Sequence, residues 1–332
     1  MDTSRHWELR RRPQGWPVPD DVALVDAPVP APGPGEVLVR NHYLSVDPYM
    51  RGRMNAAKSY AAPYEIGEPL YGGAVGEVVD SRDDRVPVGA VVQHELGWRT
   101  HSVVRGRSAV VVDPDAAPLP AYLGVLGMPG LTAWVGLHDV GELRPGQTVW
   151  VSAATGAVGS LAGQLAKLAG CRVVGSAGGA DKCRYAVEEL GYDACVDHRA
   201  GDLEGQLRDV LPDGLDLYFD NVGGDHLRAA LTLANPFAHL VECGMIAAYN
   251  EAAPPVDNLF LIVGKKLTVR GFIVRDWAHR QPLFQAHVGR LLREGQVRYD
   301  TTVVEGVERT FDALLDLLRG GPQRGKLVVD VR

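Results

Sequence analysis

The 332-residue sequence contains few cysteines and no long run of apolar or basic residues. Its four cysteines, Cys171, Cys183, Cys195 and Cys243, form no CxxC pair and lack the spacing of a secreted disulfide framework, which favours reduced thiols and a cytoplasmic location. Eighteen consecutive apolar residues occur nowhere, and the polar N-terminus has no apolar segment typical of a signal peptide. We therefore expect a protein with no membrane partner.

The charge balance argues against a nucleic acid as the main partner. The chain has a formal net charge of −7 and no long run of Lys and Arg that would bind phosphate backbones or anionic lipids. Hydrophobic residues make up 46% of the chain, which is enough to fill two cores. The composition predicts two globular domains that act on a small molecule.

Two common catalytic motifs are also missing. No GxSxG motif occurs, so a serine nucleophile of the α/β-hydrolase type has no support. The first 120 residues contain no cysteine, and the pair His94 and Glu95 does not extend to HExxH because Trp98 occupies the position of the second histidine. We expect no metal site, and a reacting carbonyl would then be polarised by hydrogen bonds.

The pattern of short strands changes near residue 120. Before it, β-rich runs between Gly and Pro predict an all-β, barrel-like domain over 1–120. After it, strands alternate with helical patterns, which predicts an α/β domain over 121–294 with helices on both faces of a doubly wound parallel sheet. The expected strands are 36–46, 73–80, 89–95 and 101–113, then 147–153, 171–177, 194–198, 215–222, 238–244 and 267–274. Residues 295–332 form a strand, a helix and a strand that we expect to return to the first domain.

A glycine-rich turn follows the first strand of the α/β domain. Ala154, Gly156 and Gly159 match the GxGxxG pattern of dinucleotide sites, with alanine at the first position. The first position needs a small residue for a tight turn, the second needs no Cβ so that a pyrophosphate can approach, and the third needs none for helix packing. A helix from Ala157 would direct free N–H groups at the phosphates. We favour a bound dinucleotide over the alternative that these glycines have a purely structural role.

The end of the second strand favours NADPH over NADH. An NAD site has an acid about twenty residues after the turn, where it accepts a hydrogen bond from the ribose 2′-hydroxyl. This chain has no acid at that strand tip, and Lys182 just beyond it can neutralise a 2′-phosphate while Ser176 supplies a directional hydrogen bond. Alternatively, Lys182 is an ordinary solvated lysine in a first helical turn, where Asp181 weakens the local positive field.

Seven motifs spread over the chain show a family resemblance. They are LSVDPYMRGRM (44–54), GVLGMPGLTAW (124–134), AATGAVGSLAGQLAK (153–167), GGADKC (178–183), FDNVGG (219–224), ECGMIAAYN (242–250) and GFIV (271–274). In this order they resemble the zinc-independent medium-chain dehydrogenase/reductases, in the branch of prostaglandin/leukotriene reductases, plant double-bond reductases and bacterial curcumin reductases. The resemblance covers essentially the whole chain. It implies a GroES-like catalytic domain beside a Rossmann domain, and NADPH-dependent reduction of the C=C bond of α,β-unsaturated ketones or aldehydes by a homodimer.

The resemblance also assigns the cofactor contacts. The glycine turn would hold the pyrophosphate, and Lys182 would bind the 2′-phosphate. Asn221, the loop 243–249 and residues 272–274 would line the ribose and nicotinamide. Two positions depart from the family pattern, because His198 stands where many relatives have Tyr and Gln323 where the family has Asn. With Ser176 added, the expected cofactor-binding residues are Gly156, Ala157, Val158, Gly159, Ser176, Lys182, His198, Asn221, Cys243, Gly244, Met245, Tyr249, Phe272, Ile273, Val274 and Gln323.

Tyr249 is the expected catalytic residue. Hydride transfer to the β-carbon of an enone leaves negative charge on the carbonyl oxygen, and a phenol with a pKa of about 10 is a protonated donor that can stabilise it. Tyr249 or water would then protonate the α-carbon. Alternatively, Tyr249 is a packing residue after a strand-end loop. The expected substrate-binding residues are Tyr49, Arg51 and Met54, although an arginine beside a glycine is as often a surface group.

Two other functions stay open at this point. An NADPH-dependent quinone or carbonyl reductase would keep the fold and the cofactor, and a nonenzymatic NADPH-binding protein would keep the cofactor site alone. The products formed from NADPH and a panel of enones separate these functions. A C=C reductase gives a saturated carbonyl, a quinone or carbonyl reductase gives a semiquinone or an alcohol, and a nonenzymatic protein gives no turnover.

Overall fold

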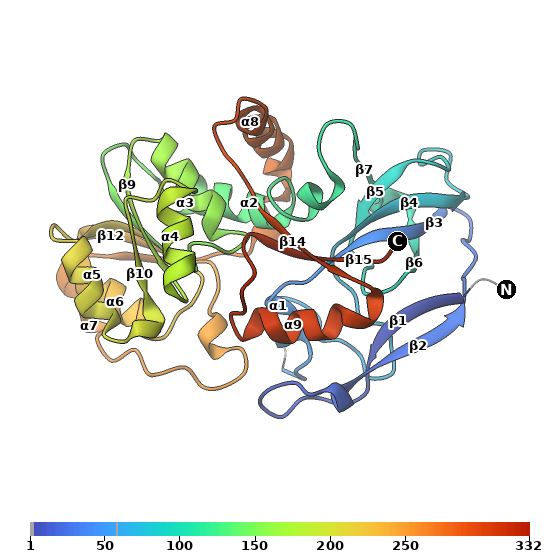
Figure 1. Cartoon of the computed structure of the whole chain (residues 1–332), viewed down its shortest axis with the longest axis horizontal. Coiled ribbons are helices and arrows are strands. Elements are labelled where there is room, and N and C mark those ends of the chain that lie inside the picture. Colours follow the sequence, from blue (N-terminus) through green and yellow to red (C-terminus); the bar gives the residue numbers. More distant parts are fainter. Residues whose placement is uncertain (1–2, 58) are drawn as a thin grey trace. The chain divides into compact units, whose positions relative to one another are not determined.

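The computed structural model describes residues 3–57 and 59–332, and the chain divides into two compact units (Figure 1). The first unit contains Met1–Gly124 and Thr301–Arg332, and the second contains Val125–Asp300. The sequence predicts boundaries after residues 120 and 294, which lie four and six residues before the observed ones. Both observed boundaries fall outside regular elements, because a 3-10 helix ends just before Gly124 and strand β14 (Thr301–Glu305) follows Asp300.

The second unit contains a six-stranded parallel sheet. Its order is β10-β9-β8-β11-β12-β13, and every pairing between neighbours is parallel. This order reverses between β8 and β11, which confirms the doubly wound sheet and places its switch point beside the glycine turn after β8. The strands are β8 (Thr148–Ser152), β9 (Arg172–Ala177), β10 (Ala194–Asp197), β11 (Leu215–Asp220), β12 (Ala234–Glu242) and β13 (Thr268–Gly271).

Helices of the second unit cover both faces of this sheet. Trp150 and Tyr218 stack with ring centroids 4.3 Å apart and share one buried core with residues of α5, α6 and α7. The next strand residue, Phe219, faces the segment after α2, where a Cβ on Gly136 would lie 2.5 Å from its ring. Because successive strand residues point to opposite faces, these two sets of helices lie on opposite faces. The helices are α2 (Met128–Val135), α3 (Gly159–Leu168), α4 (Ala180–Glu188), α5 (Leu203–Val210), α6 (Asp225–Leu233), α7 (Phe260–Lys265) and α8 (Gln281–Arg293).

The first unit is built mainly on antiparallel strands. A hairpin of β1 (Thr3–Leu9) and β2 (Val22–Pro28) pairs along its whole length, and the sequence does not predict it because polar residues obscure the alternation in β1. A second sheet runs β14-β15-β3-β4-β5-β7, and β6 also pairs with β3. The remaining elements are β3 (Glu36–Ser45), α1 (Tyr49–Arg53), β4 (Ala74–Ser81), β5 (Val91–His94), β6 (His101–Arg105), β7 (Val110–Val111), α9 (Thr310–Leu318) and β15 (Lys326–Asp330).

The predicted strand 101–113 is two strands in the structure. A Cβ on Gly106 would lie 2.0 Å from Asp83 Oδ2, so the position has room for glycine alone, and Gly106–Ser108 turn as a 3-10 helix. The pairing of β6 with β3 therefore ends at this turn, and the following strand, β7, pairs with β5. The prediction of one continuous strand is wrong because the close approach to Asp83 cannot be read from apolar periodicity.

A buried lysine joins the C-terminal strand to the rest of the first unit. Lys326 Nζ lies 3.0 Å from Asp47 Oδ1 and donates hydrogen bonds to the carbonyl oxygens of Val46, at 2.6 Å, and Leu327, at 2.9 Å. A buried ion pair of this kind needs every partner, because removal of one leaves an uncompensated charge. It fixes the segment that leads into α1 and Tyr49. Within residues 3–57 and 59–332, no helix combines the length and apolar character needed to cross a membrane.

Candidate functional site

The glycine turn lies between β8 and α3, at the carboxyl edge of the sheet in the second unit. Helix α3 begins at Gly159 and not at Ala157, because the turn continues through Val158. A Cβ on Gly159 would lie 2.4 Å from the Ala153 carbonyl oxygen, so the packing of the turn itself requires glycine. Among the described residues, a Cβ on Gly156 would meet that oxygen alone, at 3.3 Å. The open backbone at Gly156 fits the approach of a pyrophosphate.

Tyr192 holds the turn in place, and no sequence motif identifies it. Its hydroxyl donates a hydrogen bond of 2.7 Å to the Gly159 carbonyl oxygen, and the residue is buried. A Cβ would lie 2.1 Å from the Tyr192 side chain at Gly163 and 3.1 Å from it at Gly175. Glycines on α3 and β9 therefore form the groove that the ring fills. Gly163 and Gly175 are visible in the sequence, but they do not identify Tyr192 as the residue that packs against them.

Three basic residues gather at the ends of β9 and β10. The Asp197 carboxylate accepts hydrogen bonds from the backbone N–H groups of Gly179, at 2.8 Å, and Arg199, at 2.9 Å, and so joins the two strand ends. A Cβ on Gly178 would lie 2.8 Å from Arg199 Nε and 3.1 Å from His198 Nε2, so both side chains lie against this glycine. The sequence motifs include Lys182 and His198 but not Arg199.

The positive charge of this cluster comes from Arg199 and Lys182. Burial lowers the pKa of His198, and the charges of Arg199 and Lys182 lower it further, so the imidazole is neutral at pH 7. Burial alone would raise the pKa of Asp197, but its hydrogen bonds from Gly179 and Arg199 bring the pKa below the ordinary value. A 2′-phosphate at this edge would meet two cations and a carboxylate that already binds backbone N–H groups.

Ser176 does not face the basic cluster. It is fully buried, and its hydroxyl oxygen accepts a hydrogen bond of 3.3 Å from the indole N–H of Trp150. The sequence predicts that Ser176 supplies a hydrogen bond to a phosphate, and this contact stays a prediction. The hydroxyl lies in the core because Ser176 is on the same face of the sheet as Val174 and Trp150, which belong to that core.

Asn221 connects the end of β11 to the end of β8. Its side-chain N–H donates to the Ser152 carbonyl oxygen at 2.7 Å, and its backbone N–H donates to the Ser152 hydroxyl at 2.8 Å. The following residues Val222 and Gly223 donate their backbone N–H groups to Asp220 Oδ1, at 2.7 Å and 2.9 Å. The loop after β11 is therefore held at the switch point of the sheet.

The loop 243–249 after β12 is hydrogen-bonded to the same place. The N–H groups of Cys243 and Gly244 donate to the Asp220 carbonyl oxygen at 2.9 Å and 3.0 Å. Tyr249 turns back over this loop, because a Cβ on Gly244 would lie 3.3 Å from the Tyr249 hydroxyl oxygen, and Met245 is exposed. Burial raises the pKa of Cys243, and the carboxyls of neighbouring acids raise it further, so this thiol is not a nucleophile at neutral pH.

The segment after β13 completes this edge of the second unit. The Phe272 N–H donates to the Glu242 carbonyl oxygen at 3.4 Å, and the Phe272 ring is buried against Trp277. Ile273 and Val274 are half-buried at the start of a 3-10 helix. The sequence-predicted residues of the three loops therefore share one hydrogen-bonded edge.

The substrate residues expected from the sequence, and Gln323, lie in the first unit. Tyr49 begins α1, and burial followed by the Asp47 charge raises its pKa well above the usual value. Arg51 is buried and donates to Asn55 Oδ1 at 2.7 Å and to the Gly15 carbonyl oxygen at 2.6 Å. Met54 is fully buried, and Gln323 donates to the Asp316 carbonyl oxygen at 3.5 Å. Their contacts with substrate or cofactor stay predictions.

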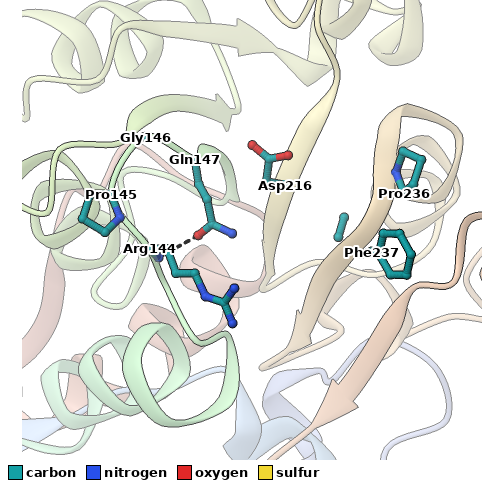
Figure 2. Close-up of a pocket in the computed structure, with 8 residues that line it drawn as sticks. Arg144, Pro145, Gly146, Gln147, Asp216, Pro236 and Phe237 are labelled. Carbon is teal, nitrogen blue, oxygen red and sulfur yellow. Dashed lines mark hydrogen bonds between the residues drawn. The ribbon is translucent and has the colours of Figure 1, made fainter.

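A surface hollow of about 420 Å³ lies at the opposite edge of the second unit's sheet (Figure 2). It is lined by Gln147, which precedes β8, by Asp216 of β11, and by Phe237 of β12. Figure 2 shows the Gln147 side chain accepting a hydrogen bond, of 2.8 Å, from the backbone N–H of Arg144. This hollow is at the amino ends of the strands, so it is separate from the glycine turn.

Two protein-family models match the chain. One, described as the N-terminal domain of oxidoreductase, covers residues 5–112, and the other, described as zinc-binding dehydrogenase, covers residues 157–289. Across residues 3–57 and 59–332, the structure contains no group of three or more His, Cys, Asp or Glu that could hold a metal ion.

Known proteins match nearly the whole chain. The NADPH-dependent curcumin reductase of Escherichia coli (strain K12) is 42% identical over 99% of this chain and 97% of its own length. The 2-alkenal reductase (NADP(+)-dependent) of Nicotiana tabacum is 38% identical over 97% of this chain and 96% of its own. Prostaglandin reductase 1 of Bos taurus is 38% identical over 99% of both chains. The structure of CurA in complex with NADPH from Vibrio vulnificus is 40% identical, covers 99% of both chains and has a TM-score of 0.94.

Two alanine substitutions separate packing from ligand approach in the glycine turn. In Gly159→Ala the methyl group collides with the Ala153 carbonyl, so we expect the free protein to unfold about 3–10 °C lower. In Gly156→Ala the turn has room, so the unfolding temperature should change by about 1 °C or less. Both variants should bind NADPH at least about tenfold more weakly in a fluorescence titration. Equal destabilisation of the two free variants would contradict this division of roles.

Proposed function

Because this chain belongs to the medium-chain dehydrogenase/reductase family, we propose that it reduces the C=C bond of α,β-unsaturated ketones and aldehydes. It is an oxidoreductase that uses NADPH. Its relatives include a reductase named for 2-alkenals, which are unsaturated aldehydes. The observation that carries the proposal is the Tyr249 hydroxyl, which lies over the backbone of Gly244 in the loop after β12.

The glycine turn is proposed to bind the pyrophosphate. The open side of Gly156 admits a phosphate to the backbone, and α3 begins three residues later with its amino end at the turn. The positive end of the helix dipole favours an anion at the same place. We assign the contacts to Gly156, Ala157, Val158 and Gly159.

The basic cluster at β9 and β10 is proposed to bind the 2′-phosphate of NADPH. Lys182 and Arg199 supply charge, and the neutral His198 ring lies against Gly178 beside the Arg199 guanidinium. A guanidinium can donate two parallel hydrogen bonds to a phosphate, whereas the lysine acts as a point charge. NADH lacks this phosphate, so the cluster favours NADPH.

The loops after β11, β12 and β13 are proposed to hold the ribose and nicotinamide. When bound, NADPH supplies a hydride to the β-carbon of the substrate. Tyr249 then donates a hydrogen bond to the carbonyl oxygen, where negative charge develops, and Tyr249 or water gives the proton to the α-carbon. The proposed contacts with the nicotinamide end are Asn221, Cys243, Gly244, Met245, Tyr249, Phe272, Ile273 and Val274.

The first unit is proposed to contribute substrate and cofactor residues of its own. Tyr49 has a raised pKa, so its phenol stays protonated and able to donate a hydrogen bond. Arg51 would act by fixing the loop at Gly15 and the end of α1, because its hydrogen bonds go to these places. Met54 would form an apolar wall, and Gln323 would extend its amide to the cofactor.

Three further properties belong to the proposal. We propose a homodimer, because β13 is the edge strand of the parallel sheet and all four of its residues are exposed, so a second copy can pair with it. We propose a reaction without zinc, because Tyr249 supplies the hydrogen bond that the developing charge needs. We propose a cytoplasmic location, which the four reduced cysteines favour.

Tyr249→Phe should lower kcat with an enone while NADPH affinity is largely retained. The loss should be about 10²–10³-fold, the usual effect of removing one donor to a developing oxyanion. Steady-state kinetics measure kcat, a fluorescence titration measures NADPH binding, and mass and NMR spectra identify the product of the wild-type enzyme. An unchanged kcat would remove Tyr249 from the mechanism. An alcohol or semiquinone product would instead support a carbonyl or quinone reductase, and binding without turnover a nonenzymatic protein.

Lys182→Gln and Arg199→Gln should each weaken NADPH binding by about tenfold, because each loses a charged contact with the 2′-phosphate. NADH binding should change by about twofold or less, since NADH has no such phosphate. Fluorescence titrations with both nucleotides measure the ratio. Arg184→Gln is the matched control, because Arg184 is an exposed arginine on α4 that pairs with Asp181. Equal losses for NADPH and NADH would argue against the assignment of this cluster.

Val269→Asp should shift the protein from two chains toward one, because it places a charge on the edge strand β13 at a residue that is 39% exposed. Light scattering coupled to size-exclusion chromatography measures the molar mass. Val79→Asp on β4 is the matched control, with 37% exposure, and should leave the mass unchanged. A wild-type mass of a single chain would rule out the proposed dimer.

A further inference from the structure

Two carboxyl groups are buried side by side at the carboxyl ends of β11 and β12. Asp220 and Glu242 are paired residues in the register of these neighbouring strands. Asp220 is fully buried, and its Oδ1 accepts four hydrogen bonds. The donors are the Tyr218 hydroxyl at 2.7 Å, the Ser152 hydroxyl at 3.1 Å, and the N–H groups of Val222 at 2.7 Å and Gly223 at 2.9 Å.

The other three oxygens of this carboxyl pair lack a donor. Asp220 Oδ2, Glu242 Oε1 and Glu242 Oε2 are buried and have no hydrogen-bond partner among the residues that the structure describes. Two ionised carboxylates cannot hydrogen-bond each other, but a single proton converts one of them into a donor. One shared proton would therefore satisfy two of the three oxygens.

The surroundings of the pair favour retention of that proton. Burial raises the pKa of Glu242 to about 8, and the Asp220 carboxyl contributes to the rise. Burial also raises the pKa of Asp220, although its hydrogen bonds oppose the rise. Both carboxyls thus favour the protonated form, which persists at neutral pH and is lost as the pH rises through about 8.

Of the described residues on the elements around the pair, none donates a hydrogen bond to its three unpartnered oxygens. From β8 comes the neutral Ser152 hydroxyl, and the pKa values of Tyr218 on β11 and Cys243 after β12 are raised, chiefly by burial, so both stay neutral. On α6, burial lowers the pKa of His226 to about 3. On α7, Lys265 Nζ donates to the carbonyl oxygens of Leu231 and Thr232, at 3.1 Å and 2.6 Å.

Asp220 and Glu242 also accept hydrogen bonds from the loops that surround the proposed nicotinamide site. The Asp220 side chain binds the N–H groups of Val222 and Gly223, and its carbonyl oxygen binds those of Cys243 and Gly244. The Glu242 carbonyl oxygen accepts the N–H of Phe272. Repulsion between two buried anions at these residues would act directly on all three loops.

We propose that Asp220 and Glu242 share one proton, and that this proton holds the loops after β11, β12 and β13 in the arrangement that binds NADPH. Glu242 is then a positioning residue, which acts on the cofactor through Asp220 and the loop backbones. The inference rests on the proposed placement of the nicotinamide at these loops. NADPH affinity should be highest while the proton is present and should fall when it leaves.

A titration of NADPH binding against pH tests the inference. For a single proton that leaves near pH 8, the dissociation constant should rise about tenfold between pH 7 and pH 9. In Glu242→Gln the amide N–H can donate to Asp220 at every pH, so the dissociation constant should stay near the neutral wild-type value and vary by about twofold or less. Cys183→Ser on α4 is the control, because a hydrogen bond with Cys195 lowers the pKa of the Cys183 thiol, which can therefore also lose a proton as the pH rises.

The outcomes separate this inference from the proposed function. The shared proton is overturned as the cause of the pH dependence if the NADPH dissociation constant of the wild type does not change with pH. It is also overturned if the dissociation constant of Glu242→Gln changes as steeply as that of the wild type. In both cases NADPH still binds, so the proposed function remains intact. Loss of the pH dependence in Cys183→Ser also overturns the shared proton as its cause. If NADPH does not bind at any pH, the proposed cofactor site fails, and infrared spectra decide on the proton. A protonated carboxyl band should be present in the wild type at pH 7 and absent from Glu242→Gln, and its absence from the wild type overturns the proposal.

Discussion

The second unit depends on the close approach of α3 to the end of β8. Gly159 lies so near the Ala153 carbonyl that no Cβ fits between them, and the Tyr192 hydroxyl donates a hydrogen bond to the Gly159 carbonyl oxygen. Because this contact is made by backbone, the first turn of α3 is fixed at the carboxyl edge of the sheet. The strand order then brings the ends of β9, β10, β11 and β12 to the same edge. Most of the proposed cofactor contacts of the second unit follow these strands.

Charge is distributed unevenly along that edge. Arg199 and Lys182 lie at the ends of β9 and β10, whereas the buried carboxyls of Asp220 and Glu242 lie at the ends of β11 and β12. The glycine turn follows β8 between them. A dinucleotide with a 2′-phosphate at one end and an uncharged carboxamide at the other matches this order. The acidic pair needs a proton because three of its four oxygens are buried without a hydrogen-bond donor among the described residues.

Several parts of this description were predictable from the sequence because they are local. Apolar periodicity predicted the six strands of the parallel sheet, and the glycine spacing after the first of them predicted the turn. The order of seven motifs indicated the medium-chain dehydrogenase/reductase family and NADPH, which the full-length relatives confirm. The hairpin β1–β2 and the break at Gly106 were not predictable, because the first depends on pairing between polar strands and the second on contact with Asp83.

The sequence by itself determined the fold class, the family and the cofactor, because strand periodicity, glycine spacing and motif order are properties of short stretches. Only the tertiary structure decided which side chains face the proposed site. Ser176 turned out to be in the core, Arg199 lies on Gly178, and Glu242 meets Asp220. Each of these outcomes depends on the pairing of strands that are distant in the chain, and a shift of one residue in a strand reverses the face that each side chain occupies.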